Sequence, residues 1–145
     1  LQEAVTFHGR LDDAGMAAVL ARCKLSISVP ESDATSVSVL ESMACGLAVL
    51  ASDLPANRYW LAPGALVPAR LPQPSVLQKP GALVPVGDAE ALAAQWLALM
   101  QDERRAAGLG AANAARIAAE GDRRVQMDAM DAHYRRLLAE ACARS

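Results

Sequence analysis

The chain lacks the sequence features that mark several large classes of protein. Its three cysteines, Cys23, Cys45 and Cys142, stand far apart and offer neither the close pairs of a zinc site nor a disulfide framework. It has no charged segment followed by an apolar stretch, as a signal peptide has, and no run of about twenty apolar residues that could span a membrane. We therefore expect a cytoplasmic location, with peripheral association of the full-length protein with a membrane left open.

An excess of positive charge is also missing. The chain carries 14 Lys and Arg residues against 16 Asp and Glu residues, so its formal net charge is −2. That balance lacks the basic field that binding to a phosphate backbone requires, and we expect no nucleic-acid partner. No glycine-rich phosphate fingerprint is present, which disfavours a Rossmann dinucleotide site and a P-loop. The two histidines, His8 and His133, have no partner at catalytic spacing.

What the first third of the chain does contain is an alternation of short apolar strands and helical segments. Strands are predicted at residues 4–7, 25–30 and 47–52. Asp12 or Asp13 is predicted to cap the first helix, and the second covers residues 36–45 with Gly46 as its terminator. Repeated β–α units predict an α/β fold, with a Rossmann-like parallel sheet sandwiched by helices, in a single domain over residues 1–145.

The middle of the chain changes in character. Every proline except Pro30 lies between Pro55 and Pro85, and we expect this stretch to be a long surface loop. The hexapeptide PGALVP occurs in it twice. Without residues 66–82 the two copies would reduce to one, and the pattern of segments would run on uninterrupted. We therefore predict that residues 66–82 are a dispensable loop insertion.

Helices are predicted beyond this loop. Asp88 is suited to cap a helix whose inner face carries Leu92, Trp96, Leu99 and Met100. A helical C-terminal segment follows at residues 102–143, and apolar residues recur along its last stretch. We expect these apolar residues to pack against the core or against a partner domain.

The most informative stretch is DATSVSVLESMACG, at residues 33–46. It places two carboxylates, Asp33 and Glu41, eight positions apart across a strand-to-helix turn that is rich in hydroxyl groups. The loop at residues 31–35 lies just before a helix, whose free N–H groups and dipole favour an anion. This arrangement is suited to a sugar nucleotide.

The same residues also have purely structural explanations. Ser38 and Glu41 match a capping box, in which the glutamate closes back on the backbone of the serine. Asp33 is suited to an Asx-turn that leads into the helix. Thr35 and Ser36 are ordinary N-cap residues. Spacing alone does not decide between these roles and ligand binding.

The order of the segments resembles the C-terminal, donor-binding half of the family-4 retaining glycosyltransferases, which have the glycosyltransferase B fold. The most distinctive match is SVLESMACGLAVLASDLPANRYW, at residues 38–60. Residues 5–9, 25–30 and 81–93 and the ERR-type helix beyond them support it, so nearly the whole chain takes part. The resemblance implies an enzyme of the hexosyltransferase type, which transfers a sugar from a nucleotide diphosphate to an acceptor hydroxyl.

The resemblance also implies roles for individual residues. In that family two glutamates bracket the loop, and Glu41 occupies the position that holds the ribose hydroxyls of the nucleotide. Asp33 occupies the position near the donor sugar with a side chain one methylene shorter, which makes it the candidate catalytic residue. The backbone N–H groups of Ala34, Thr35, Ser36 and Val37 match the turn that receives the diphosphate. Such preorganised donors stabilise the leaving group, so we expect no metal and no cofactor besides the donor.

The partners implied are a nucleotide-diphosphate sugar and an acceptor-binding N-terminal half. That half, together with the basic residues that clamp the diphosphate in this family, would lie upstream of Leu1. We therefore expect the chain to be a fragment that is inactive alone. The alternatives are a non-catalytic α/β interaction module that binds a partner through its last helix, and a generic doubly wound domain without a nucleotide site.

Overall fold

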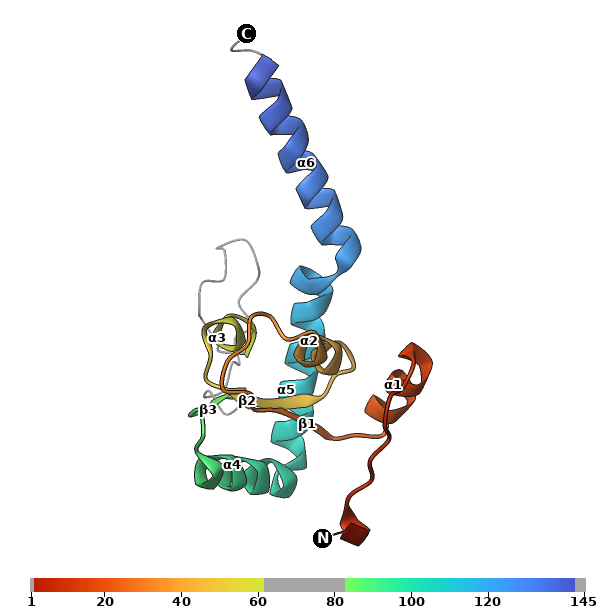
Figure 1. Cartoon of the computed structure of the whole chain (residues 1–145), viewed down its shortest axis with the longest axis vertical. Helices are drawn as coiled ribbons and strands as arrows, with labels where there is room; N and C mark the ends of the chain where they lie inside the picture. The colour runs from red at the N-terminus through yellow and green to blue at the C-terminus, as the bar shows by residue number, and fades with distance from the viewer. Residues whose placement is uncertain (1, 62–82, 143–145) are drawn as a thin grey trace.

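The computed structural model of the chain describes residues 2–61 and 83–142. In these residues strands and helices alternate as an α/β domain (Figure 1). The strands are β1 (Leu25–Ser28), β2 (Ala48–Ser52) and β3 (Leu83–Val84). The helices are α1 (Asp13–Leu20), α2 (Val37–Ala44), α3 (Pro55–Leu61), α4 (Ala89–Gln101), α5 (Glu103–Arg116) and α6 (Arg123–Cys142). A 3-10 turn, Gln2–Ala4, precedes them, and a π-helical turn, Ile117–Gly121, joins α5 to α6.

The three strands form one parallel sheet in the order β1-β2-β3. Leu25 pairs with Ala48 in the first strand pair, and Ala51 pairs with Leu83 in the second. β2 is the central strand and all of its residues are buried, whereas β1 at the edge is only partly buried. Figure 1 shows α2 and α3 on one side of the sheet and α4 on the other. The predicted α/β fold, with a parallel sheet between helices and further helices at the C-terminus, is therefore confirmed.

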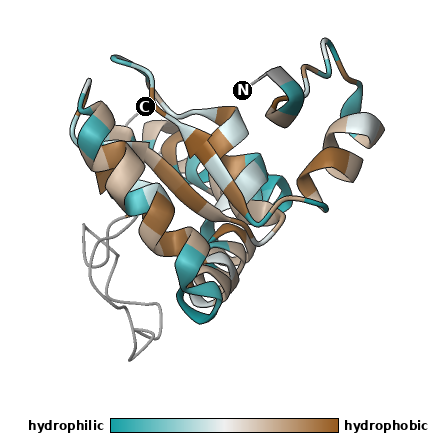
Figure 2. Ribbon diagram, turned by 90° about the horizontal axis from the view of Figure 1, so that it is seen from below, coloured by the Kyte–Doolittle hydropathy of each residue, from teal (hydrophilic) through white to brown (hydrophobic). Residues whose placement is uncertain are grey.

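The core lies where α2 packs on the central strand. Val39 and Met43 of α2 contact Val49 and Ala51 of β2, and all four side chains are buried. Successive side chains of a strand point to opposite faces, so the buried Leu50 lies on the other face, which α4 covers. Figure 2 shows hydrophobic residues on the strands and on parts of the helices beside them. The sheet is thereby held rigidly at its centre.

Aspartates cap the helices where the sequence predicts it. The N–H of Gly15 donates to Oδ1 of Asp12 at 2.8 Å, and the N–H of Ala91 donates to Oδ1 of Asp88 at 2.8 Å. Each bond satisfies one of the N–H groups that a helix start leaves without an intrahelical partner. At the end of α2, Gly46 has a φ of +74°, which a residue without a Cβ adopts at little cost. The prediction of Gly46 as helix terminator is confirmed.

The strand predicted at residues 4–7 is wrong. In the structure these residues belong partly to the 3-10 turn and pair with no strand of the described sheet. Phe7 is 93% exposed. An apolar pattern becomes a strand only if a neighbouring strand supplies its hydrogen bonds, and here the segment leads instead to α1, which lies apart from the sheet in Figure 1.

The long loop predicted between Pro55 and Pro85 is partly wrong. Pro55 begins α3, because proline at the first helical position has a suitable φ and loses no intrahelical bond. Asn57 supports the helix by donating from Nδ2 to the carbonyl of Ser52 at 2.9 Å. The predicted insertion at residues 66–82 lies outside the described residues.

The predicted inner face of α4 is correct only in part. Leu99 is buried, but Trp96 is 48% exposed and Met100 is exposed as well. The last helix departs further from the packed core that apolar periodicity predicts, since no residue of α6 is buried. Figure 1 shows α6 projecting away from the sheet. Its exposed apolar side chains are Val125, Met127, Met130, Tyr134, Leu137 and Leu138.

Candidate functional site

The carboxyl ends of the three strands are joined by hydrogen bonds into one surface. Oγ of Ser52 at the end of β2 donates to the carbonyl of Pro30, in the loop after β1, at 2.6 Å. The N–H of Asp53 donates to the carbonyl of Val84, at the end of β3, at 2.7 Å. We call the segments that follow the strands, residues 29–36, 53–61 and 85–88, the carboxyl rim. Ligands of parallel α/β sheets bind at this end.

The predicted site residues lie on the loop after β1, which belongs to the carboxyl rim, and on α2, which adjoins it. Asp33 is in the loop after β1, and Glu41 is in α2, which begins directly after that loop. Both side chains are exposed. Within residues 2–61 and 83–142, neither carboxylate makes a hydrogen bond or an ion pair. Both are therefore available to a ligand.

The capping box predicted as an alternative for Glu41 does not form. The N-cap of α2 is Ser36 and not Ser38, so the third helical position, from which a glutamate closes back on the cap, is occupied by Val39 and not by Glu41. The Asx-turn predicted for Asp33 is also not formed, since no backbone N–H donates to its side chain in the described structure. The structural explanations of these two acidic residues are thus wrong.

The start of α2 is the part of the site with unused hydrogen-bond donors. Ser36 makes no side-chain cap; its Oγ lies 2.9 Å from Oγ of Ser38 instead. The first backbone bond is from the N–H of Leu40 to the carbonyl of Ser36, at 3.2 Å. In the described part of the chain, the N–H groups of Ala34, Thr35, Ser36 and Val37 donate to no acceptor. By contrast, aspartates cap the starts of α1, α4 and α5. Uncapped N–H groups at a helix start favour an anion.

An ion pair that sequence reasoning missed also lies on the carboxyl rim. Arg58 in α3 binds Asp53 with two parallel bonds, Nε to Oδ1 at 2.5 Å and Nη2 to Oδ2 at 2.9 Å. These bonds hold the pKa of the Asp53 carboxyl below its usual value and raise the pKa of the Arg58 guanidinium. The spacing of five residues is no standard helical pair, because Asp53 precedes the helix, and so no sequence pattern pointed to this ion pair.

A second missed group joins α3 to the π-helical turn. The Arg116 guanidinium lies over the rings of Tyr59 and Trp60, with centroids at 5.2 and 5.8 Å, and Tyr59 donates its hydroxyl to Oε2 of Glu120 at 3.0 Å. Burial is the main reason why the pKa of Tyr59 is raised. The group combines residues about sixty positions apart, which sequence patterns do not relate. It anchors the turn from which α6 starts.

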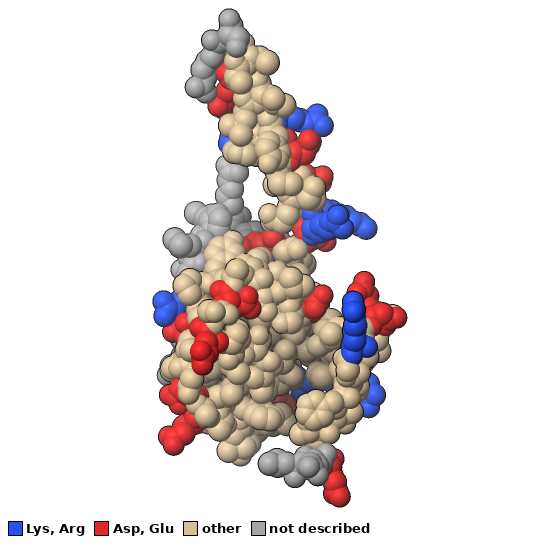
Figure 3. All heavy atoms as spheres, in the orientation of Figure 1, with Lys and Arg blue, Asp and Glu red and all other residues tan. Residues whose placement is uncertain are grey.

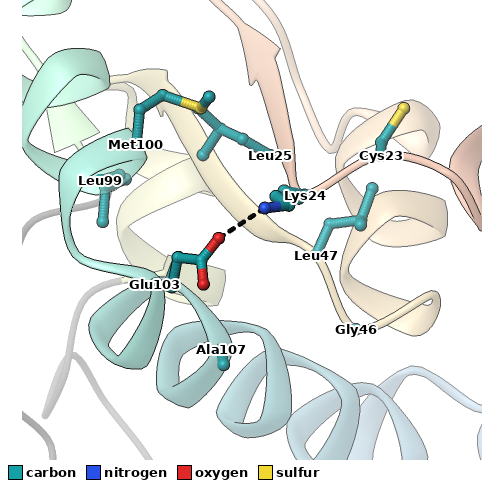
Figure 4. Close-up of a pocket in the computed structure, with 10 residues that line it drawn as sticks. Cys23, Lys24, Leu25, Gly46, Leu47, Leu99, Met100, Glu103 and Ala107 are labelled. Carbon is teal, nitrogen blue, oxygen red and sulfur yellow. Dashed lines mark hydrogen bonds and ion pairs between the residues drawn. The ribbon is translucent and has the colours of Figure 1, made fainter.

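A cavity in the described part of the chain lies at the other end of the sheet. Its volume is about 310 Å³, and its walls include Leu25 and Leu47 at the starts of β1 and β2 and Met100 of α4 (Figure 4). An ion pair of 2.6 Å between Nζ of Lys24 and Oε1 of Glu103 crosses it. Their hydrogen bond raises the pKa of Lys24 and lowers the pKa of Glu103. This cavity contains none of the predicted site residues. The cavity and the residues suited to bind a donor therefore lie at opposite ends of the sheet. We assign the candidate site to the carboxyl rim and the adjoining α2, because the unused donors and free carboxylates lie there.

Among the residues that the structure describes, no three His, Cys, Asp or Glu side chains are placed to hold a metal ion together. Over the same residues, no helix has the length and apolar character needed to cross a membrane.

A family model described as glycosyl transferases group 1 matches residues 1–102, which include the sheet and the candidate site. No curated protein matches the chain.

Proposed function

Because the chain belongs to the glycosyl transferases group 1 family, we propose that it is the C-terminal, donor-binding half of a retaining family-4 glycosyltransferase. It binds a nucleotide-diphosphate sugar at the carboxyl rim. There it provides one side of a site in which a hexose passes to an acceptor hydroxyl. No metal takes part in this proposal; backbone N–H groups stabilise the charge of the leaving diphosphate.

The observation that carries the proposal is the uncapped start of α2 beside two unpaired carboxylates. A diphosphate supplies the acceptor oxygens that the N–H groups of residues 34–37 lack. A ribose or a hexose supplies hydroxyl groups, which donate to carboxylates in charge-assisted bonds. Glu41 then holds the ribose hydroxyls, and Asp33 contacts the sugar next to the bond that breaks.

The exposed apolar residues of α6 support the proposed partner. Most of the stability of a helix in a protein comes from packing of its apolar face, yet α6, with 20 residues, buries no side chain in the described structure. Packing against the proposed acceptor-binding half would cover Met127, Met130 and Leu137, which share one side of the helix at spacings of three and seven residues. The same exposed surface favours the second candidate function, a non-catalytic module that binds a partner through α6.

Nucleotide binding tests the proposal and separates the two functions. Uridine and guanosine diphosphates should each be titrated against the chain, with thermal shift and calorimetry as readouts. One of them is expected to bind, and Glu41→Gln is expected to weaken that binding roughly 10- to 150-fold, because a charge-assisted bond of about 1.5–3 kcal/mol is lost. The stability of the unliganded variant should not change, since Glu41 has no partner in the described structure.

Glu31→Gln is the matched control for this experiment. Glu31 lies in the loop that leads into α2, is exposed and has no partner in the described residues, so its substitution removes one negative charge near the same site, as Glu41→Gln does. A similar loss of affinity in both variants would mean a general charge effect and would end the assignment of Glu41 to the ribose. Absence of binding by the unaltered chain would favour the interaction module.

A further inference from the structure

The carboxyl rim has a charge distribution that is unfavourable for the proposed donor. Its described residues include the acidic residues Glu31, Asp33, Asp53 and Asp88, but only one cationic residue, Arg58. Figure 3 shows acidic side chains on the visible face of the body, with basic side chains mainly at its margins. Carboxylates repel a diphosphate, and the partial charges at the start of α2 are small in comparison with full charges. Arg58, the single cation of the rim, is therefore the side chain of the rim that can offset the negative charge of a diphosphate.

Arg58 is held at a defined place on the rim. Asp53, to which it is bonded, directly follows β2, and its N–H is bonded to Val84 of β3. The neighbour of Asp53, Ser52, is bonded to Pro30 in the loop that leads to α2. The guanidinium is thus fixed, through short links, to the loop that carries Asp33 and the free N–H groups.

The bonds to Asp53 leave most of the guanidinium unused. A guanidinium has five N–H donors, and the carboxylate of Asp53 takes only the two on one side of the fork. The others have no acceptor in the described part of the chain. The Arg58 side chain is 58% exposed and that of Asp53 36%, and pairs so exposed contribute little to stability. The arrangement orients a cation more than it stabilises the fold.

We propose that Arg58, oriented by Asp53, binds the phosphate groups of the donor from the side of β2 and α3. This inference rests on the proposed function and adds a specific cationic contact to it. The diphosphate would lie between the N–H groups at the start of α2 and the free side of the guanidinium. Planar guanidinium groups bind phosphate oxygens with paired hydrogen bonds, for which a point charge is a poorer substitute. Asp53 is a positioning residue in this arrangement.

The test compares ligands with and without phosphate. Dissociation constants of Arg58→Gln should be measured for uridine and guanosine diphosphates and for uridine and guanosine. We expect affinity for the diphosphate that binds the unaltered chain to fall at least tenfold, with no change for its nucleoside. The dependence of diphosphate affinity on salt concentration should become weaker, because one cationic contact is lost. Arg58→Lys keeps the charge but not the fork-shaped guanidinium, so its affinity for the diphosphate should lie between the affinities of the unaltered chain and of Arg58→Gln.

Lys24→Gln is the matched control, since Lys24 is also an exposed cation in an ion pair but lies at the opposite end of the sheet. It should leave diphosphate affinity unchanged. If Glu41→Gln weakens binding but Arg58→Gln does not, the inference about Arg58 is wrong and the proposed function stands. Equal losses for diphosphate and nucleoside in Arg58→Gln would also overturn it. If the unaltered chain binds no nucleotide diphosphate, both proposals fail.

Discussion

Replacement of Gly110 by alanine is expected to destabilise the chain by about 3 kcal/mol or more. Gly110 lies in α5, where that helix crosses the start of β2. A Cβ at this position would stand 2.0 Å from the carbonyl oxygen of Gly46 and 2.9 Å from its carbon. Both atoms belong to the backbone, so no side chain is able to rotate away. One turn later, Asn113 donates from Nδ2 to the carbonyl of Leu47 at 2.9 Å, which fixes the helix in this close position.

Gly108→Ala provides the control for that substitution. Gly108 belongs to the same helix, and a Cβ there would meet no atom within 4 Å. The gain in helix propensity should therefore stabilise the chain by about 0.5–1 kcal/mol. Urea denaturation followed by circular dichroism measures both variants. Equal stability of Gly110→Ala and the unaltered chain would show that α5 does not approach Gly46 so closely.

The second large effect concerns catalysis. The chain by itself is expected to transfer no sugar from any nucleotide donor, and activity should appear when the proposed acceptor-binding half is joined to it. Transfer requires an acceptor held against the anomeric carbon and enough positive charge to stabilise the diphosphate. The carboxyl rim offers one described cation for that charge. Product formation from radiolabelled uridine and guanosine diphosphate sugars, with and without the proposed acceptor-binding half, measures the difference.

Asp33→Ala is the control that links any activity to the proposed site. In the joined protein it should abolish transfer while leaving the melting temperature close to that of the parent, because the Asp33 side chain has no partner in the described structure. Hydrolysis or transfer by the isolated chain that disappears in Asp33→Ala would contradict the expectation that it holds half a site.

Features that depend on neighbours in the sequence were predictable. The aspartate caps at Asp12 and Asp88 and the glycine terminator at Gly46 each act within a few residues, so their residue types are sufficient evidence. β2 was equally clear, because an apolar run between turn signals predicts a buried strand. The sequence motif around Glu41 also indicated a glycosyltransferase, and the family match agrees.

Where residues distant in sequence meet, the sequence was insufficient. Residues 4–7 have the pattern of a strand, yet no described strand pairs with them, and a strand cannot form without inter-strand bonds. Trp96 follows helical periodicity but stays half-exposed, since periodicity defines a face and not what covers it. For Glu41 the spacing allowed a cap, and only the observed start of α2 at Val37 excluded it.

The sequence by itself therefore determined the succession of β1, α2 and β2, the cap at Asp88, the terminator at Gly46 and the family, because local hydrogen bonding and apolar periodicity act over a few residues. The tertiary structure alone decided which polar groups remained without partners. It left the N–H groups at the start of α2 unbonded, bonded Arg58 to Asp53, and placed Arg116 on Tyr59. Whether a donor or a charge is satisfied depends on every group that the fold brings near it, and that is a property of packing in three dimensions.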